Sequence, residues 1–228
     1  MAIIKSPKKV IAFLFAGAAI VVMSSCNKTN SSLTGTGILF ANGCVGATSS
    51  SLTVNGIGLP NAASVPYLGN SGYQSVASGT VTINGILNGV GSLGSLTATL
   101  NANEHYSVFD CGTVLADSLV IITDSFPASG GNYAYARLVN VSSDSTASQI
   151  TGAVGNNLVG SNIAYGAASG FVQVTPGAYS ITAFNVNKPA NVATLSNVQL
   201  NGGQIYTLMY SGNSNQTVGF KVTVINNN

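Results

Sequence analysis

The chain has 228 residues, of which 46% are hydrophobic and only 5% are charged. Three of its seven basic residues, Lys5, Lys8 and Lys9, lie near the start; from residue 26 on, four basic and five acidic residues leave a net charge of −1. The absence of a basic patch argues against nucleic-acid binding, and the high hydrophobic fraction argues against disorder.

Residues 1–25 are predicted to be a lipoprotein signal peptide. The apolar run Val10–Met23 follows the basic start, and it is shorter than the roughly 20 residues that a membrane-spanning helix needs. Small residues, Ser24 and Ser25, precede Cys26 and resemble the bacterial lipobox. The sequence therefore predicts acyl chains on Cys26 that hold the protein in a membrane, with an ordinary signal peptide cut nearby as the alternative.

Residues 26–33 are polar and are predicted to form a tether between the membrane and the first domain. The stretch after Cys26 has no acidic residue, which leaves both the periplasmic and the surface face of the membrane open. The expected localisation is the bacterial cell envelope, lipid-anchored to the outer membrane.

Alternating apolar segments separated by Gly, Asn and Ser turns predict strands throughout the rest of the chain. In a first domain, residues 34–127, strands are expected near 37–42, 51–55, 72–76, 79–84, 94–100, 104–110 and 118–123. In a second domain, residues 128–228, they are expected near 134–141, 148–153, 170–174, 178–184, 192–200, 204–210 and 217–225. Pro127 and the Ser-Gly-Gly that follows predict a short hinge between the domains.

The two domains repeat each other. The stretch 67–83 has a counterpart at 165–181 without a gap, and 100–112 has one at 200–212. The second unit, through 136–144, 163–166, 174–179 and 200–210, resembles domain of unknown function 4397, a β-sandwich module often carried in tandem by bacterial envelope lipoproteins. The expected fold is all-β: two tandem immunoglobulin-like antiparallel β-sandwiches after an N-terminal signal helix. The resemblance implies no catalytic or binding residues.

Cys44 and Cys111 are the only other cysteines, and the second repeat has Ser142 and Ser211 in their places. Each cysteine lies just past the end of a predicted strand, and these strand ends are expected at one pole of the sandwich. In an oxidising envelope a disulfide between them would stabilise the domain by about 3–4 kcal/mol on the chain-entropy model. Two unpaired thiols are the alternative.

No motif in the sequence predicts catalysis, a cofactor or a metal site. Gly89–Gly94 matches G-x-G-x-x-G, but a strand rather than a helix is expected after it, so the stretch is predicted to be a loop between strands. His105 is the only histidine, which excludes a multi-histidine zinc site and leaves a Ser-His-Asp triad dependent on that one residue.

The sequence therefore predicts a lipid-anchored, non-enzymatic envelope protein that acts as a structural or binding module, with an envelope protein or a glycan as its partner. One alternative is a fimbrial or adhesin-type subunit that assembles by strand addition, because the terminal segment Val218–Ile225 is hydrophobic. The other is an envelope hydrolase that uses His105 or two acidic residues.

Overall fold

Short strands joined by tight turns make up the folded part of the chain. The computed structural model describes residues 35–128, 131–142, 144, 149–213 and 219–228. In these residues the chain has seventeen strands, one short 3-10 turn, η1 (Pro60–Ala62), and no α-helix. The predicted all-β class is confirmed, and the predicted signal helix lies outside the described residues.

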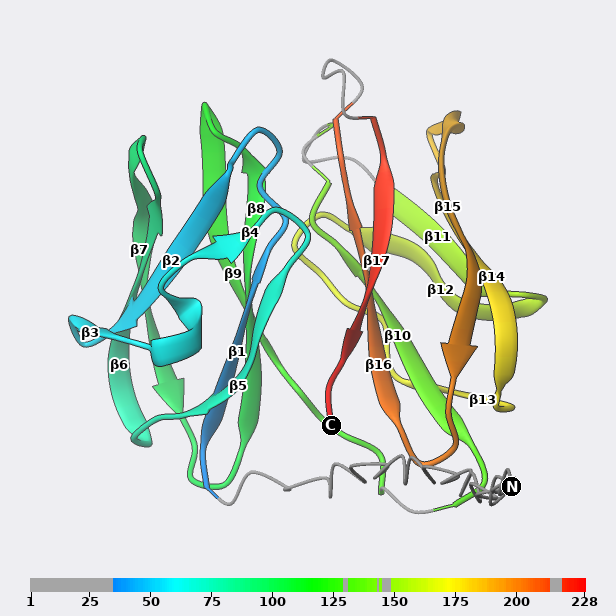
Figure 1. The fold of residues 1–228 in the computed structure, drawn as a ribbon, viewed down its shortest axis with the longest axis horizontal. Coiled ribbons are helices and arrows are strands. Elements are labelled where there is room, and N and C mark those ends of the chain that lie inside the picture. Colours follow the sequence, from blue (N-terminus) through cyan, green and yellow to red (C-terminus); the bar gives the residue numbers. More distant parts are fainter. Residues whose placement is uncertain (1–34, 129–130, 143, 145–148, 214–218) are drawn as a thin grey trace, which may run out of the picture. The chain divides into compact units, whose positions relative to one another are not determined.

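Strands β1 to β9 form two facing sheets (Figure 1). Sheet A has the order β5-β1-β8-β9, with strands β1 (Gly37–Asn42), β5 (Asn70–Ser75), β8 (His105–Thr113) and β9 (Ala116–Thr123). Sheet B has the order β3-β2-β6-β7, with strands β2 (Ser49–Val54), β3 (Ile57–Gly58), β6 (Gly79–Leu87) and β7 (Gly91–Leu100); β4 (Val65–Pro66) also pairs with β2.

Strands β10 to β17 repeat this arrangement. Sheet C has the order β13-β10-β16-β17, with strands β10 (Ala134–Asn140), β13 (Val172–Val174), β16 (Ile205–Ser211) and β17 (Lys221–Asn226). Sheet D has the order β12-β11-β14-β15, with strands β11 (Gln149–Val154), β12 (Asn157–Ala164), β14 (Gly177–Asn185) and β15 (Lys188–Leu200). Between named strands the pairing is antiparallel, except that β1 runs parallel to β8 and β10 parallel to β16.

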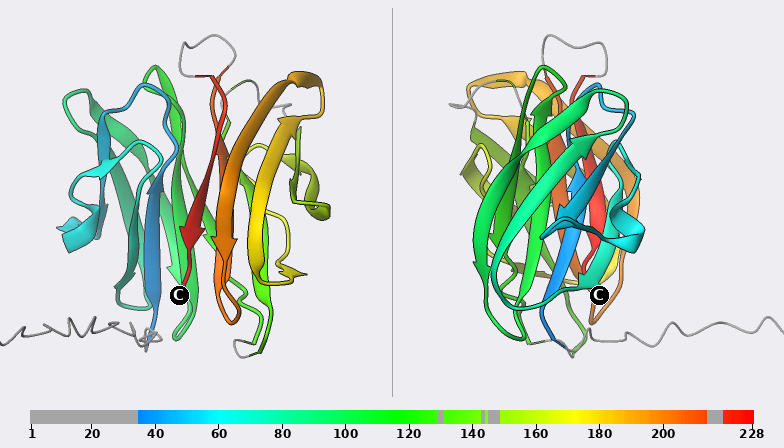
Figure 2. Two further views of the ribbon diagram at one scale, coloured as in Figure 1. Left: turned by 45° about the vertical axis from the view of Figure 1, so that its right-hand side comes forward. Right: turned by 90° about the vertical axis from the view of Figure 1, so that its left-hand side faces the viewer.

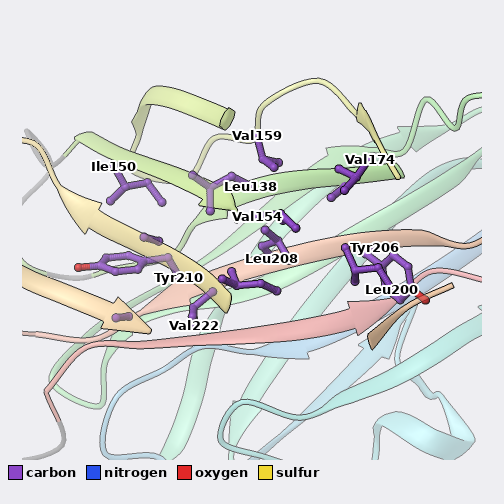
Figure 3. Close-up of a cluster of buried hydrophobic side chains, with 14 of the residues drawn as sticks. Leu138, Ile150, Val154, Val159, Val174, Leu200, Tyr206, Leu208, Tyr210 and Val222 are labelled. Carbon is purple, nitrogen blue, oxygen red and sulfur yellow. The ribbon is translucent and has the colours of Figure 1, made fainter. Parts of the chain in front are cut away.

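Each pair of sheets encloses its own hydrophobic core, because alternate residues of every strand point between the sheets. Ile38, Phe40 and Val108 of sheet A meet Leu52, Val81 and Ile83 of sheet B. Figure 3 shows the matching core of the second sandwich, where the labelled side chains converge from sheets C and D. Fully burying a side chain of this kind contributes about 1.5–3 kcal/mol.

A third hydrophobic cluster joins sheet A to sheet C. It consists of Leu39, Ala41, Phe109, Cys111, Val139, Val141, Met209 and Ile225, and we call it the seam. The central strands are consequently buried on both faces: all six residues of β1 and all seven of β16 are buried. The layers therefore follow the order B, A, C, D, and both pairs of sheets belong to one compact unit, Ser31–Asn228.

The strands predicted from the sequence match the observed ones closely. The expected segment at 37–42 is β1 without any shift, and Gly89–Gly94 lies in the β6–β7 turn and at the start of β7, with no helix after it. The sequence reasoning missed β12 and the short strands β3 and β4. Among the described residues, no helix has the length and apolar character needed to cross a bilayer.

Candidate functional site

Two asparagines that recur in both repeats form hydrogen bonds to backbone groups. Asn42 donates through Nδ2 to the Val65 carbonyl at 3.0 Å, and its Oδ1 accepts from the Cys44 amide at 3.0 Å. Asn140 makes the same two bonds, to Ile163 and from the Ser142 amide. These side chains satisfy backbone groups of neighbouring segments, so their repetition reflects the requirements of the fold.

Positions where the repeats differ are more informative, and two of them meet at the seam. Arg137 stands on β10 where the first repeat has Leu39. Asp124 follows β9 where the second repeat has Asn227, and the equivalence is clear because their amides donate to the carbonyls of His105 and Ile205, each at 2.8 Å. The duplicated fold thus brings one unmatched cation and one unmatched anion to the same seam.

Arg137 and Asp124 form a buried ion pair across the seam. Their side chains are 2% and 0% exposed, and Nη2 of Arg137 donates to Oδ1 of Asp124. Nη2 also contacts Oγ of Ser107 at 3.2 Å, and Nε donates to Oγ1 of Thr207 at 3.0 Å. Buried charges persist only when they are paired and hydrogen-bonded, and this pair meets both conditions.

The remaining oxygen of Asp124 is satisfied as well. Its Oδ2 accepts from Ser107 Oγ at 2.8 Å and from the Tyr73 hydroxyl at 2.5 Å. Burial and then the neighbouring Asp124 carboxylate hold the pKa of Tyr73 well above its usual range, so that the hydroxyl keeps the proton it donates. Asn227 extends the network by donating through Nδ2 to the Tyr73 oxygen at 3.2 Å, and its Oδ1 accepts from Thr207 at 2.7 Å.

Aromatic side chains cover this network at one end. The Arg137 guanidinium lies over the ring of Phe171, 4.8 Å from its centroid, and Phe126 contacts Phe171 at 5.8 Å between centroids. Tyr73 packs edge-on against His105 at 5.2 Å and against Phe126 at 5.9 Å. The ring contacts and the stacked guanidinium shield the ion pair from water, which strengthens it.

An open pocket of about 370 Å³ lies beside the aromatic cover. It is lined by Asn103, Glu104, His105, Asp124, Ser125 and Phe126. The Asp124 carboxylate is occupied by Arg137, Ser107 and Tyr73, and His105 is held against Tyr73 and Phe126 at 5.2 and 5.7 Å. The sole histidine therefore packs as an aromatic ring beside an acid that is already paired, which differs from the base and nucleophile arrangement of a triad.

Asp110, on β8, is the other unusual acid of the first sandwich. It is 0% exposed, and among the described residues neither carboxyl oxygen has a hydrogen-bond partner; the nearby Ser50 hydroxyl also lacks one there. Burial raises the pKa of Asp110 from 3.8 to about 7; Ser50 opposes the rise and Asp117 adds to it. No bond of hydrogen-bonding geometry joins Asp110 to Ser50, so desolvation dominates.

Both cysteines of the first domain are free thiols and fully buried. Cys44 packs with Ala47, Leu87 and Val114, whereas Cys111 belongs to the seam. The side chains of successive strand residues alternate between faces, and here the two thiols project to opposite faces of sheet A. The predicted disulfide is therefore not formed in this structure, and its presence in the oxidised protein stays a prediction.

Residues outside the seam network have other surroundings. Cys26 lies outside the described residues. Asp144 pairs with Lys188 at 3.3 Å, whereas Asp124 pairs with Arg137. Among the tyrosines, Tyr133 is 46% exposed, while Tyr210 is buried and stacks on Phe220 at 5.5 Å. No cluster of three or more His, Cys, Asp or Glu suited to a metal occurs among the described residues.

Sequence reasoning did not identify the Arg137–Asp124 pair. The signal that could have found it is an arginine inside the apolar segment Ala134–Asn140, at a position where the first repeat has leucine. A charge in a strand that is otherwise apolar requires a buried partner of opposite sign.

Comparison with known proteins agrees with the duplicated architecture. The family model described as "Domain of unknown function (DUF4397)" matches residues 36–151 and 134–228. No curated protein matches the chain significantly. Among solved structures, the module CBMbc (family CBM26) of Eubacterium rectale Amy13K, in complex with maltoheptaose, shares 14% identity at a TM-score of 0.26, over 84% of this chain and 96% of that one. The predicted resemblance is thus confirmed: the chain belongs to the DUF4397 family, with two matching regions in tandem.

Proposed function

We propose that the protein is a lipid-anchored, non-enzymatic module of the bacterial cell envelope that binds a partner through its folded unit. The observation that carries this proposal is the seam network. Arg137, Asp124, Ser107 and Thr207 are buried and bonded to one another, so their polar groups hold the two sandwiches together. Groups used in this way are preorganised for stability, and both carboxylate oxygens of Asp124 are engaged within the seam.

The anchor is proposed from the sequence, through acylation of Cys26 after an apolar signal segment. Between Cys26 and the described residues lie eight residues, mostly polar, which can span at most about 29 Å at 3.3–3.6 Å per residue. A unit on so short a tether would stay close to the outer membrane. Two or three acyl chains supply lasting attachment because each buried methylene contributes about 0.8 kcal/mol.

The two alternative functions, assembly by strand addition and hydrolysis, gain no support from a specific contact. The terminal strand β17 pairs with β16 from Tyr206 to Ser211, and Asn227 just after it bonds to Tyr73 in the seam. A strand with these contacts serves its own fold, whereas strand addition needs a free donor segment. A hydrolase would need acids or His105 free for chemistry, but Asp124 is paired with Arg137.

Membrane fractionation tests the anchor and the folded module separately. The wild-type chain is expected to stay with membranes after a carbonate wash and to incorporate radiolabelled palmitate. Cys26→Ser is expected to lose both while its folded unit keeps the same thermal unfolding profile. Equal retention and labelling of the two proteins would contradict the proposal.

A further inference from the structure

Charged residues are distributed unevenly among the four sheets. Between Lys28 and Glu104 the chain contains no Asp, Glu, Lys, Arg or His, and this interval includes every strand of sheet B. The acids and the arginine of the folded unit cluster instead on sheets A and C and in their loops, as Asp110 and Arg137 do. Sheet B is thus an outer layer whose strands carry no ionisable side chain.

The outward face of sheet B is a regular array of hydroxyl and amide groups. On β6 the exposed Thr80 and Thr82 alternate with the buried Val81 and Ile83. The array consists of Thr80, Thr82 and Asn84 on β6 and Ser95, Thr97 and Thr99 on β7. In the right-hand view of Figure 2 these two strands lie side by side at the front.

The register of β6 and β7 turns these residues into cross-strand pairs. Thr80 lies opposite Thr99, Thr82 opposite Thr97, and Asn84 opposite Ser95. The hydroxyls of Thr80 and Thr99 are 3.4 Å apart. Neighbouring strands are about 4.8 Å apart and side chains on one face repeat about every 6.7 Å along a strand, so the array offers donors and acceptors on a fixed lattice.

The absence of charge and the spacing of the hydroxyl and amide groups indicate the class of partner that fits this face. A face without charge gives no electrostatic attraction to anionic polymers or to nucleic acid. Its strands also lack the aromatic and arginine anchors that dominate protein interfaces. Among the described side chains of these strands, the exposed large apolar ones are Ile57 on β3 and Ile86 on β6. Hydroxyl and amide groups on a lattice match an extended chain that presents hydroxyls at regular intervals.

We propose that the outward face of sheet B is the docking surface of the protein and that its partner is an uncharged polysaccharide. This inference rests on the proposed function, because it names the surface and the partner class of that binding module. Each hydroxyl pair contributes little, since a single hydrogen bond exchanged with water is weak. Binding therefore depends on many pairs along the polymer and favours long chains over single sugars.

The outer face of sheet D provides a matched contrast. There Thr182 lies opposite Thr194, but the next pair along β14 and β15 is Phe184 with Val192, and Lys188 begins β15. The hydroxyl lattice is broken by apolar groups and a cation. The second sandwich is therefore expected to contribute nothing to polysaccharide docking.

The test uses the acylated full chain in detergent micelles and measures retention on insoluble polysaccharides. Cellulose, amylose resin and chitin represent neutral polymers, and alginate beads represent an anionic one. The double variant Thr82→Lys/Thr97→Glu places a salt-bridging pair on the array, which keeps β6 and β7 paired while introducing hydrated charges. The control is Thr182→Lys/Thr194→Glu on sheet D.

The wild-type chain is expected to bind at least one neutral polymer, with no weakening between low and high salt, and to ignore alginate. Thr82→Lys/Thr97→Glu is expected to reduce retention at least tenfold, and the sheet D control to leave it within twofold. Absence of binding to every neutral polymer, or equal loss in both variants, would overturn the inference. Either result would leave the membrane retention of Cys26 variants unaffected, so failure here is distinguishable from failure of the anchor.

Discussion

The Arg137–Asp124 pair should hold the two sandwiches together as one unit, and a double-mutant cycle tests this directly. Asp124→Asn introduces the residue of the second repeat and leaves Arg137 buried without its anion. Arg137→Leu introduces the residue of the first repeat and leaves Asp124 with only Ser107 and Tyr73 as donors. Removing one member of a buried pair costs about 3–5 kcal/mol, since the remaining charge stays desolvated.

The double variant Asp124→Asn/Arg137→Leu should cost much less than the two single changes together. Replacing both charges by neutral groups removes the desolvation penalty along with the attraction, and a coupling energy of about 2–3 kcal/mol is expected. Urea unfolding followed by tyrosine fluorescence measures the three free energies. Single variants should also separate the unfolding of the two sandwiches into two transitions. Single costs below about 1 kcal/mol, or additive costs, would refute the role given to the pair.

Three further changes test other parts of the structure. Gly43→Ala would place a Cβ 2.5 Å from Cγ2 of Val141, so it should lower the free energy of unfolding in urea by about 1–3 kcal/mol, and Val141→Gly should partly restore it. An unchanged urea midpoint would contradict the close packing of the seam. Because burial raises the pKa of Asp110 from 3.8 to about 7, the folded state holds a proton that the unfolded state loses between about pH 4 and 7. The free energy of unfolding should therefore fall by up to about 4 kcal/mol as pH rises from about 4 to 7, and Asp110→Asn should abolish that fall. An equal pH dependence in both proteins would contradict the raised pKa. Burial raises the pKa of the Cys44 and Cys111 thiols, so iodoacetamide at pH 8 should label them at least a hundredfold faster in urea than in the native protein. If they are not labelled in urea without reductant, the predicted disulfide is present instead.

The strands could be predicted from the sequence because local chemistry fixes them. Segments such as Thr80–Ile83 alternate between polar and apolar residues, and the structure places the apolar ones in the core. The duplication predicted two similar units, and the shared asparagines Asn42 and Asn140 indeed make the same bonds in both. The local alternation of polar and apolar residues is sufficient to predict a strand wherever one of its faces meets a core and the other meets solvent.

The seam was not predicted because it depends on contacts between residues far apart in sequence. β1 reads as a continuous apolar strand, which fits a single sandwich as well as a strand buried on both faces. The short hinge expected near Pro127 gives no sign of the contacts made beside it, where Phe126 packs on Phe171 and Asp124 pairs with Arg137. Similarly, a shared pole for the two strand ends does not fix the face of sheet A on which each thiol lies, and Cys44 and Cys111 pack in different clusters.

Intact-mass analysis of the protein purified from its native membrane is the decisive test of the lipid anchor. We expect the mass of residues 26–228 increased by acyl chains on Cys26. A mass equal to an unmodified chain that begins near residue 26 would contradict the lipid anchor and indicate ordinary secretion of the binding module.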